Sequence, residues 1–241
     1  KSDWLDVAKQ ALISRGDVGA LGGPGITPRN DPFWARVSGA FFLSSTSGGF
    51  PERYVSCPPC KSVDDWPSVN LIVRKSVYEL IGGFDSNYWP GEDTLFCLKI
   101  IKQAELNILY VPNLVVWHHR RPGLRKHLRQ IGNYGKHRGY FVKNYPETSC
   151  RIKYFIPTLW LVFVLSGVTL SSVSPWLEWT YLAGWLAYFI VLVFSWKDIM
   201  RFEPITIAIG ATPYIFLSHL WYGGKFLEGL LSSKLKKSLG R

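Results

Sequence analysis

The sequence is poor in acidic residues, in methionine and in the short motifs that would assign it at once to a common class. It carries 17 Asp and Glu against 28 Lys and Arg, a net charge of +11, and Met200 is its single methionine. The phosphate-binding pattern GxxxxGK[ST] is absent, which argues against a P-loop NTPase. No secretory signal opens the chain. Because it begins at Lys1, we expect it to be part of a longer product.

Cysteine is also scarce. Cys57 and Cys60 have the CxxC spacing of redox and zinc sites, whereas Cys97 and Cys150 stand alone. A structural zinc site needs a second ligand pair, and none has suitable spacing. We therefore interpret Cys57-Pro-Pro-Cys60 as a loop that its prolines stiffen, with redox or zinc chemistry as the alternative.

Positive charge is concentrated in one stretch. Ten Lys and Arg lie between Arg120 and Lys153, against one acid, Glu147. Such a block is typical of proteins that bind nucleic acid, anionic lipid or phosphate groups. Because an apolar segment follows directly, we favour membrane lipids and a diphosphate substrate, and we expect no nucleic-acid partner.

Apolar periodicity predicts an α/β arrangement up to about residue 145. Helices are expected over residues 3–14, 31–43, 75–81 and 94–104. Strands are expected from residue 18 and over residues 70–74, 107–112 and 114–117. A basic amphipathic helix over 123–145 is predicted to lie at a membrane interface. The Ser-, Gly- and Pro-rich stretch 44–67 is expected to be a loop, long enough to act as a lid or to bind an acceptor.

Residues 146–241 are expected to form a membrane domain. The segments 154–173 and 176–196 are long enough to span a bilayer, contain no Lys or Arg, and carry Trp and Tyr near their ends. A third apolar segment, 205–222, contains Pro213 and His219, so the number of transmembrane helices is two or three. The alternative for all three is a buried helix of a soluble core. The predicted domains are therefore 1–145 and 146–241.

The placement of Lys and Arg predicts the orientation. Arg151 and Lys153 precede the first apolar segment, Lys197 and Arg201 follow the second, and the loop between them has neither residue type. Residues 1–145 should then face the cytoplasm. If the third segment also spans, the basic C-terminal end would lie on the other side, and the sequence does not decide between these arrangements.

Glu92 and Asp93 are the first candidates for chemistry. They follow Gly91, which gives access to the backbone, and Trp89, whose ring offers a flat surface to a sugar. A carboxylate that keeps its charge and lies within hydrogen-bonding reach of a hydroxyl can remove its proton. The alternative is that Asp93 is a helix N-cap, or that both acids complement the helix dipole.

Polar residues gather again some 25 positions later. His118 and His119 close a strand, and because neighbouring strand residues point to opposite faces, at most one should enter a site. Arg120 and Arg121 suit a diphosphate, since a guanidinium binds phosphate oxygens as a fork, although a positively charged membrane flank would also explain them. Gln130 and Arg138 lie on the predicted basic helix, where they either reach a substrate or are solvated. Surface histidines with ordinary hydrogen bonds are the alternative for the imidazole pair.

Several of these strings occur together in one known family. They are Gly22-Gly23-Pro24, Asn70-Leu-Ile-Val-Arg74, Gly82-Gly83-Phe84-Asp85, Gly91-Glu92-Asp93, Trp117-His118-His119-Arg120-Arg121, the run Gln130…Gly135…Arg138, and His219-Leu-Trp-Tyr222-Gly-Gly-Lys-Phe226-Leu-Glu-Gly229. In this respect the chain resembles, over essentially its whole length, the C-terminal half of a family 2 glycosyltransferase. That family has a GT-A-type, Rossmann-like α/β catalytic domain followed by C-terminal transmembrane helices.

The resemblance implies a multi-pass cell-membrane enzyme that transfers a sugar, with inversion, from a nucleotide-sugar donor. The acceptor would be a cell-envelope polysaccharide or other glycan, or a glycolipid. Asp93 takes the position of the catalytic base, Glu92 supports it, and His118 takes the position of a ligand to Mg²⁺ or Mn²⁺. The remaining matched positions would line the acceptor pocket or lie near the diphosphate: Trp89, Gly91, Arg120, Arg121, Gln130 and Arg138.

One departure from the family pattern is serious. Its Asp-x-Asp metal motif and nucleotide-binding half are absent, and we expect them upstream of Lys1. The chain alone should then bind nucleotide poorly and turn over nothing. Two alternatives stay open: a non-catalytic membrane scaffold of the same fold, and a polyprenyl-phosphate sugar synthase, which differs in its acceptor.

Overall fold

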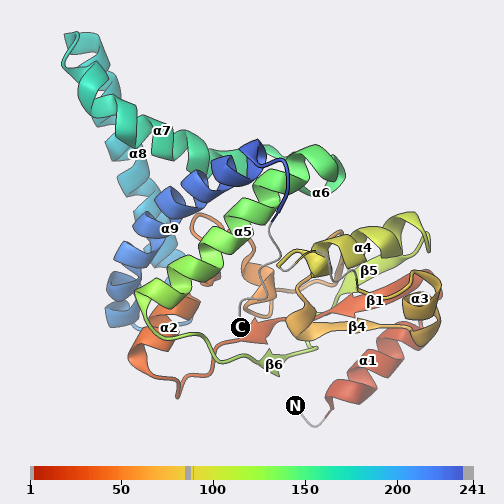
Figure 1. Cartoon of the computed structure of the whole chain (residues 1–241). Helices are drawn as coiled ribbons and strands as arrows, with labels where there is room; N and C mark the ends of the chain where they lie inside the picture. The colour runs from red at the N-terminus through yellow and green to blue at the C-terminus, as the bar shows by residue number, and fades with distance from the viewer. Residues whose placement is uncertain (1–2, 85–87, 89, 236–241) are drawn as a thin grey trace. The chain divides into compact units, whose positions relative to one another are not determined.

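A computed structural model describes residues 3–84, 88 and 90–235, and the described chain forms two compact units (Figure 1). The first, here called the α/β unit, takes in the described residues of Lys1–Asn30, Pro51–His119 and Lys234–Arg241. The second, the helical unit, takes in Asp31–Phe50 and Arg120–Ser233. The sequence pattern predicts one boundary, at residue 145, whereas in the structure the chain enters the helical unit twice. The segment Asp31–Phe50 and the basic helix both pack with the apolar helices.

The α/β unit contains a four-stranded mixed sheet and a separate strand pair. Its helices are α1 (Trp4–Ile13), α3 (Lys75–Leu80) and α4 (Glu92–Lys102). Its strands are β1 (Val18–Gly22), β2 (Gly25–Ile26), β3 (Lys61–Val63), β4 (Leu71–Val73), β5 (Asn107–Tyr110) and β6 (Val116–Trp117). The sheet order is β3-β5-β1-β4, in which β1 and β5 are parallel and both edge strands are antiparallel to their neighbours. The strands β2 and β6 pair in parallel. The predicted α/β class is thus confirmed.

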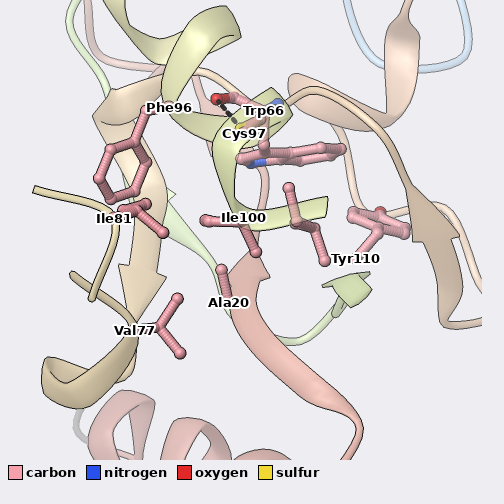
Figure 2. Packing of buried hydrophobic residues seen from close by; sticks show 9 residues of the cluster. Ala20, Trp66, Val77, Ile81, Phe96, Cys97, Ile100 and Tyr110 are labelled. Carbon is pink, nitrogen blue, oxygen red and sulfur yellow. Dashed lines mark hydrogen bonds between the residues drawn. The ribbon is translucent and has the colours of Figure 1, made fainter. Parts of the chain in front are cut away.

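Both faces of the four-stranded sheet are buried. Along β5, Ile108 and Tyr110 join a core with residues of α3 and α4, whereas Leu109 joins a second core with α1. This alternation follows from the pleat of a strand. Figure 2 shows the first core, in which Phe96, Cys97 and Ile100 of α4 share one cluster with Ala20 of β1. The pattern in β1 changes at a register shift between Val18 and Ala20.

The stretch 44–67 contains regular structure that the sequence did not indicate. The short 3-10 helix η2 (Pro51–Arg53) and the edge strand β3 lie within it. Strand β3 pairs with β5, with Lys61 opposite Tyr110 and Val63 opposite Ile108. Three residues are too few to give an alternating pattern, so the prediction of an uninterrupted loop was wrong here.

The helical unit is organised around its longest helix. It contains α2 (Phe33–Ala40), which continues into a 3-10 turn η1 (Phe41–Leu43), then α5 (Leu124–Asn144), α6 (Pro146–Ser149), α7 (Ile152–Ser171), α8 (Pro175–Ile199) and α9 (Ile205–Leu231). Helix α9 packs against α5, α7 and α2. It runs nine residues beyond the predicted end at residue 222.

Helices α5 and α9 approach each other backbone to backbone. A Cβ placed on Gly139 would lie 2.0 Å from the carbonyl oxygen of Phe226, and one on Gly229 would lie 1.9 Å from that of Lys136. Only glycine leaves room for such contact. The apolar face of α5 is therefore occupied by protein, and its basic residues Arg125, Lys126 and Arg129 are exposed.

Among the described residues, α7 and α8 are the helices long and apolar enough to cross a membrane. Only 17% of the most apolar window of α7, and 6% of that of α8, is buried, which differs from the burial of soluble core helices. In the contact between α7 and α8, an aromatic ring of each helix lies against a glycine of the other. A Cβ on Gly167 would meet the ring of Tyr181 at 2.1 Å, and one on Gly184 would meet that of Phe163 at 2.3 Å. Two apolar helices are compatible with membrane association.

Candidate functional site

The acidic pair begins helix α4. Gly91 is the N-cap, with a φ of 114° that side-chain-bearing residues rarely adopt, and Glu92 and Asp93 occupy the first turn. Asp93 is therefore not the N-cap, and that alternative interpretation is wrong. Both carboxylates still lie where the helix dipole favours negative charge. The left-handed glycine turns the chain so that the pair stands at the start of the helix.

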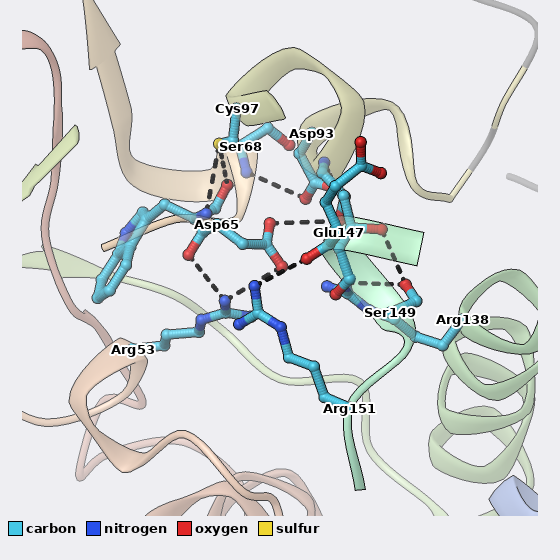
Figure 3. A network of polar contacts seen from close by, with 12 residues as sticks. Arg53, Asp65, Ser68, Asp93, Cys97, Arg138, Glu147, Ser149 and Arg151 are labelled. Atoms are coloured by element: carbon cyan, nitrogen blue, oxygen red, sulfur yellow. Dashed lines mark hydrogen bonds and ion pairs between the residues drawn. The ribbon is translucent and has the colours of Figure 1, made fainter. Parts of the chain in front are cut away.

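The carboxylate of Asp93 is held by backbone groups. Its Oδ1 accepts a hydrogen bond from the N–H of Thr94 at 2.8 Å, and its Oδ2 accepts one from the N–H of Ser68 at 3.4 Å (Figure 3). The Thr94 hydroxyl in turn donates to Oδ1 of Asp65 at 3.2 Å. These contacts fix the orientation of the carboxylate, which suits a group that must lie within hydrogen-bonding reach of a hydroxyl.

The 3-10 turn η3 (Ser68–Asn70) binds both Asp93 and the segment before β6, the strand that His118 directly follows. Its first residue binds Asp93, as described. A Cβ placed on Gly25 would lie 3.5 Å from Cβ of His118 and 3.6 Å from Cγ1 of Val69. Gly25 is therefore close to both side chains. The Asn70 amide donates to the carbonyl oxygen of Leu114 at 2.6 Å, in the segment leading into β6. The turn η3 thus contacts Asp93 through Ser68 and the segment before β6 through Asn70.

Trp66 supports this turn, and sequence analysis did not identify it. The side chain is buried, its Nε1 donates to the carbonyl oxygen of Gly23 at 3.1 Å, and its ring lies 5.1 Å from that of Tyr110. Arg53 pairs with Asp65 at 3.3 Å, next in sequence to the tryptophan (Figure 3). A single Trp in a polar stretch has no periodic signal, and only the folded chain reveals its role.

Glu92 differs electrostatically from its neighbour. Partial burial, and then the adjacent charge of Asp93, raise the pKa of the Glu92 carboxyl to about 7. Its Oε2 is buried and makes no hydrogen bond to the described residues. Near neutral pH, Glu92 is therefore divided between its protonated and ionised forms.

This raised pKa predicts an unusual stability profile. Because the folded-state pKa lies above the ordinary value of 4.5, the folded protein binds more protons between pH 4.5 and 7, and the unfolding free energy falls as pH rises through that window. Glu92→Gln should stabilise the protein at pH 8 by about 1–2 kcal/mol, after allowance for partial exposure, with little effect at pH 4.5. Thermal unfolding in detergent at both pH values measures this.

The matched control is Glu79→Gln. Glu79 is an exposed acid that pairs with Lys75 on α3 at 3.7 Å, so its removal should change the melting temperature little at either pH. A Glu92→Gln variant that is less stable than wild type at pH 8 would contradict the assignment of a desolvated carboxyl.

The two histidines follow β6 rather than closing it, because that strand ends at Trp117, and they differ in exposure. His118 is half-buried and His119 is exposed. Within the part of the chain that the structure describes, no group of three or more His, Cys, Asp or Glu is arranged to hold a metal ion. These residues do not by themselves fit a divalent-metal site, and His118 would supply one ligand at most. The metal requirement stays a prediction of the resemblance.

The four other predicted contact residues belong to the helical unit. Arg120 is buried, with its guanidinium 5.5 Å from the ring centroid of Phe42, whereas Arg121 is exposed. The Gln130 amide donates to the hydroxyl of Tyr134 at 2.8 Å.

Arg138 is held by its own unit. Its guanidinium donates to the carbonyl oxygen of Thr148 at 3.2 Å and to the Ser149 hydroxyl at 3.4 Å, and it lies over the ring of Tyr154 at 4.9 Å (Figure 3). These contacts make Arg138 a fixed cation. Asp85 and Trp89 of the sequence prediction lie outside the described residues.

The CxxC loop has no sign of an activated thiol. Partial burial raises the pKa of the Cys57 thiol, whereas redox-active cysteines have lowered values. The Cys57 N–H donates to the hydroxyl of Tyr110 at 2.8 Å, which attaches the loop to β5. The interpretation as a structural loop is favoured.

No protein-family model matches this chain, and no curated protein sequence matches it.

Proposed function

We propose that the chain is the acceptor-side and membrane part of an inverting family 2 glycosyltransferase with a GT-A-type catalytic domain. The observation that carries this proposal is the geometry of Asp93. Backbone groups hold its carboxylate at the start of α4, and the turn that supplies one of them also binds the segment before β6, which His118 directly follows. A carboxylate held in a fixed position, within reach of an acceptor hydroxyl, is what activation of that hydroxyl requires.

The proposed chemistry uses Asp93 as the base. Its carboxylate takes the proton of an acceptor hydroxyl while that oxygen forms a bond to the anomeric carbon of the donor. The bond from that carbon to the diphosphate oxygen breaks, and the nucleoside diphosphate leaves with the electron pair. Attack from the side opposite the leaving group inverts the anomeric centre. Arg121 and Arg138 are the proposed contacts for negatively charged parts of the substrates, because a guanidinium binds phosphate as a fork.

The proposed location is the cell membrane, with α7 and α8 spanning it and the α/β unit in the cytoplasm. The exposed apolar surfaces of both helices support this, as do Arg151 and Lys153 before α7 and Lys197 and Arg201 around the end of α8. The proposed acceptor is a cell-envelope glycan or a glycolipid, because both can be reached from a membrane face.

Cysteine labelling tests the orientation. Cys150, exposed before α7, should react with a membrane-impermeant maleimide only after cells are lysed. Ser172→Cys, in the exposed turn between α7 and α8, should react in intact cells. The reverse pattern would place the α/β unit outside, and equal labelling of both positions in intact cells would argue against two spans.

A donor panel tests the activity. The full product of the gene, reconstituted in nanodiscs with Mg²⁺ or Mn²⁺ because the resemblance implies a metal, is assayed for release of nucleoside diphosphate from individual nucleotide sugars. Consumption of one donor with a new glycosidic product supports the proposal. Strict dependence on a lipid-phosphate acceptor would instead identify a polyprenyl-phosphate sugar synthase. Inertness toward every donor and acceptor would favour the non-catalytic scaffold.

A further inference from the structure

The helical unit exposes large apolar side chains outside its two candidate spans. They come from the first turn of α2, the connection after α8 and the first turns of α9: Phe33, Trp34, Phe202, Ile205 and Ile209. Contiguous exposed apolar surface rimmed by polar groups marks a site of interaction with protein or membrane. We call this set the α2–α9 patch.

Direct packing joins the α2 part of the patch to its α9 part. A Cβ placed on Gly210 would lie 3.2 Å from Cζ of Phe33, so this ring covers α9 beside Ile209. The ring of Trp34 stacks on that of Tyr214, 6.4 Å away and one turn further along α9. Ile205 and Ile209 are four residues apart and share one side of their helix.

Polar contacts fix α2 in this position. The Ser38 hydroxyl pairs with Nδ1 of His127 at 2.9 Å, and Arg36 forms an ion pair with the buried carboxylate of Glu203. Just beyond η1, the Ser44 hydroxyl donates to Asp198 at 2.8 Å. Because these contacts hold α2 in place, rotation of the helix that would bury Phe33 and Trp34 must break them.

The patch continues the apolar surface of α8. That helix ends at Ile199 and α9 begins at Ile205, so the patch starts where the candidate span stops. Exposed Lys197 and Arg201 flank the same point, and cations together with Trp are typical of the bilayer interface. An aromatic and aliphatic face beside such cations is the pattern of an interfacial helix.

We infer that the first turn of α2 and the start of α9 enter the interfacial layer of the bilayer, so that lipid covers the α2–α9 patch. This inference rests on the proposed membrane location of α7 and α8. It assigns a third membrane contact to a segment, Asp31–Phe50, that the sequence placed in the cytoplasmic domain.

Photocrosslinking tests the inference. The photoreactive residue p-benzoylphenylalanine replaces Phe33 or Trp34 in the full chain, which is reconstituted in nanodiscs of phosphatidylcholine and phosphatidylglycerol and irradiated. Lipid adducts are quantified by mass spectrometry. Tyr78 of α3 is the matched negative position, since it is 44% exposed, as Phe33 is. Leu186, exposed on α8, is the positive position.

The expected result is lipid adduct at positions 33 and 34 at a yield near that of position 186 and about tenfold or more above that of position 78. Adduct at 186 but only background at both 33 and 34 overturns the inference and leaves the membrane location standing. Background at all four positions overturns both. Using two positions in α2 guards against a substitution that disturbs the contact with Gly210.

Discussion

Asp93→Asn is expected to abolish sugar transfer by the full gene product while leaving it folded. Asparagine has nearly the same shape, and its carbonyl oxygen can still accept a hydrogen bond from Ser68 or Thr94, which now hold the carboxylate at 3.4 and 2.8 Å. What it cannot do is take a proton from an acceptor hydroxyl. Loss of a general base lowers the rate by about 10²–10⁴-fold. The loss should appear in kcat with little change in KM, because the base acts in the transition state.

Two variants control this measurement. Asp6→Asn removes an exposed carboxylate from α1 and should leave transfer and melting temperature unchanged. Glu92→Gln tests the neighbouring carboxyl, whose pKa near 7 makes it the other possible base. Its expected effect on kcat is much smaller than that of Asp93→Asn. If Glu92→Gln abolished transfer and Asp93→Asn did not, the roles of the two acids would be reversed.

Most helices and strands of the α/β unit could be predicted from the local pattern of apolar residues. Helices α1, α3 and α4 and strands β1, β4 and β5 each appear about where the apolar pattern predicts them, because the helices bury one face and the strands are short apolar runs. Helix α4 begins two residues earlier than predicted, at Glu92, since a left-handed glycine rather than Asp93 supplies the cap. That shift explains why the acids lie in the first turn.

The packing of segments that lie far apart in the sequence could not be predicted from that pattern. Nothing local distinguishes α2 from a helix of the α/β unit, yet its contacts are with α9, and the polar partners of Ser38 and Ser44 lie 89 and 154 positions away. Trp66 and Asn70 were likewise missed as site residues, because their hydrogen bonds join turns with no periodicity of their own. Glu92 and Asp93 were predicted from their neighbours Trp89 and Gly91 and from the family resemblance, whereas the turn that binds Asp93 is visible only in the tertiary contacts.

Gly23→Ala is expected to destabilise the protein strongly. A Cβ at this position would lie 1.9 Å from the carbonyl oxygen of Leu114 and 2.6 Å from Nδ2 of Asn70. Neither atom is free to move, since they bind each other at 2.6 Å. The backbone of Gly23 also donates to the carbonyl oxygen of Asn70 and accepts from Trp66, both at 3.1 Å. Relief of the clash must therefore break contacts around η3, at a cost of about 3 kcal/mol or more.

The melting temperature in detergent should then fall by roughly 6–12 °C. Gly16→Ala is the matched control, because a Cβ on this exposed glycine meets nothing within 4 Å. Equal melting of the two variants would contradict the close approach of Gly23 to Leu114. Gly23→Ala should also lose transfer below its melting temperature, since η3 positions Asp93. It would thus lose stability and activity together, whereas Asp93→Asn loses activity alone, and that contrast separates the residue that positions the base from the base itself.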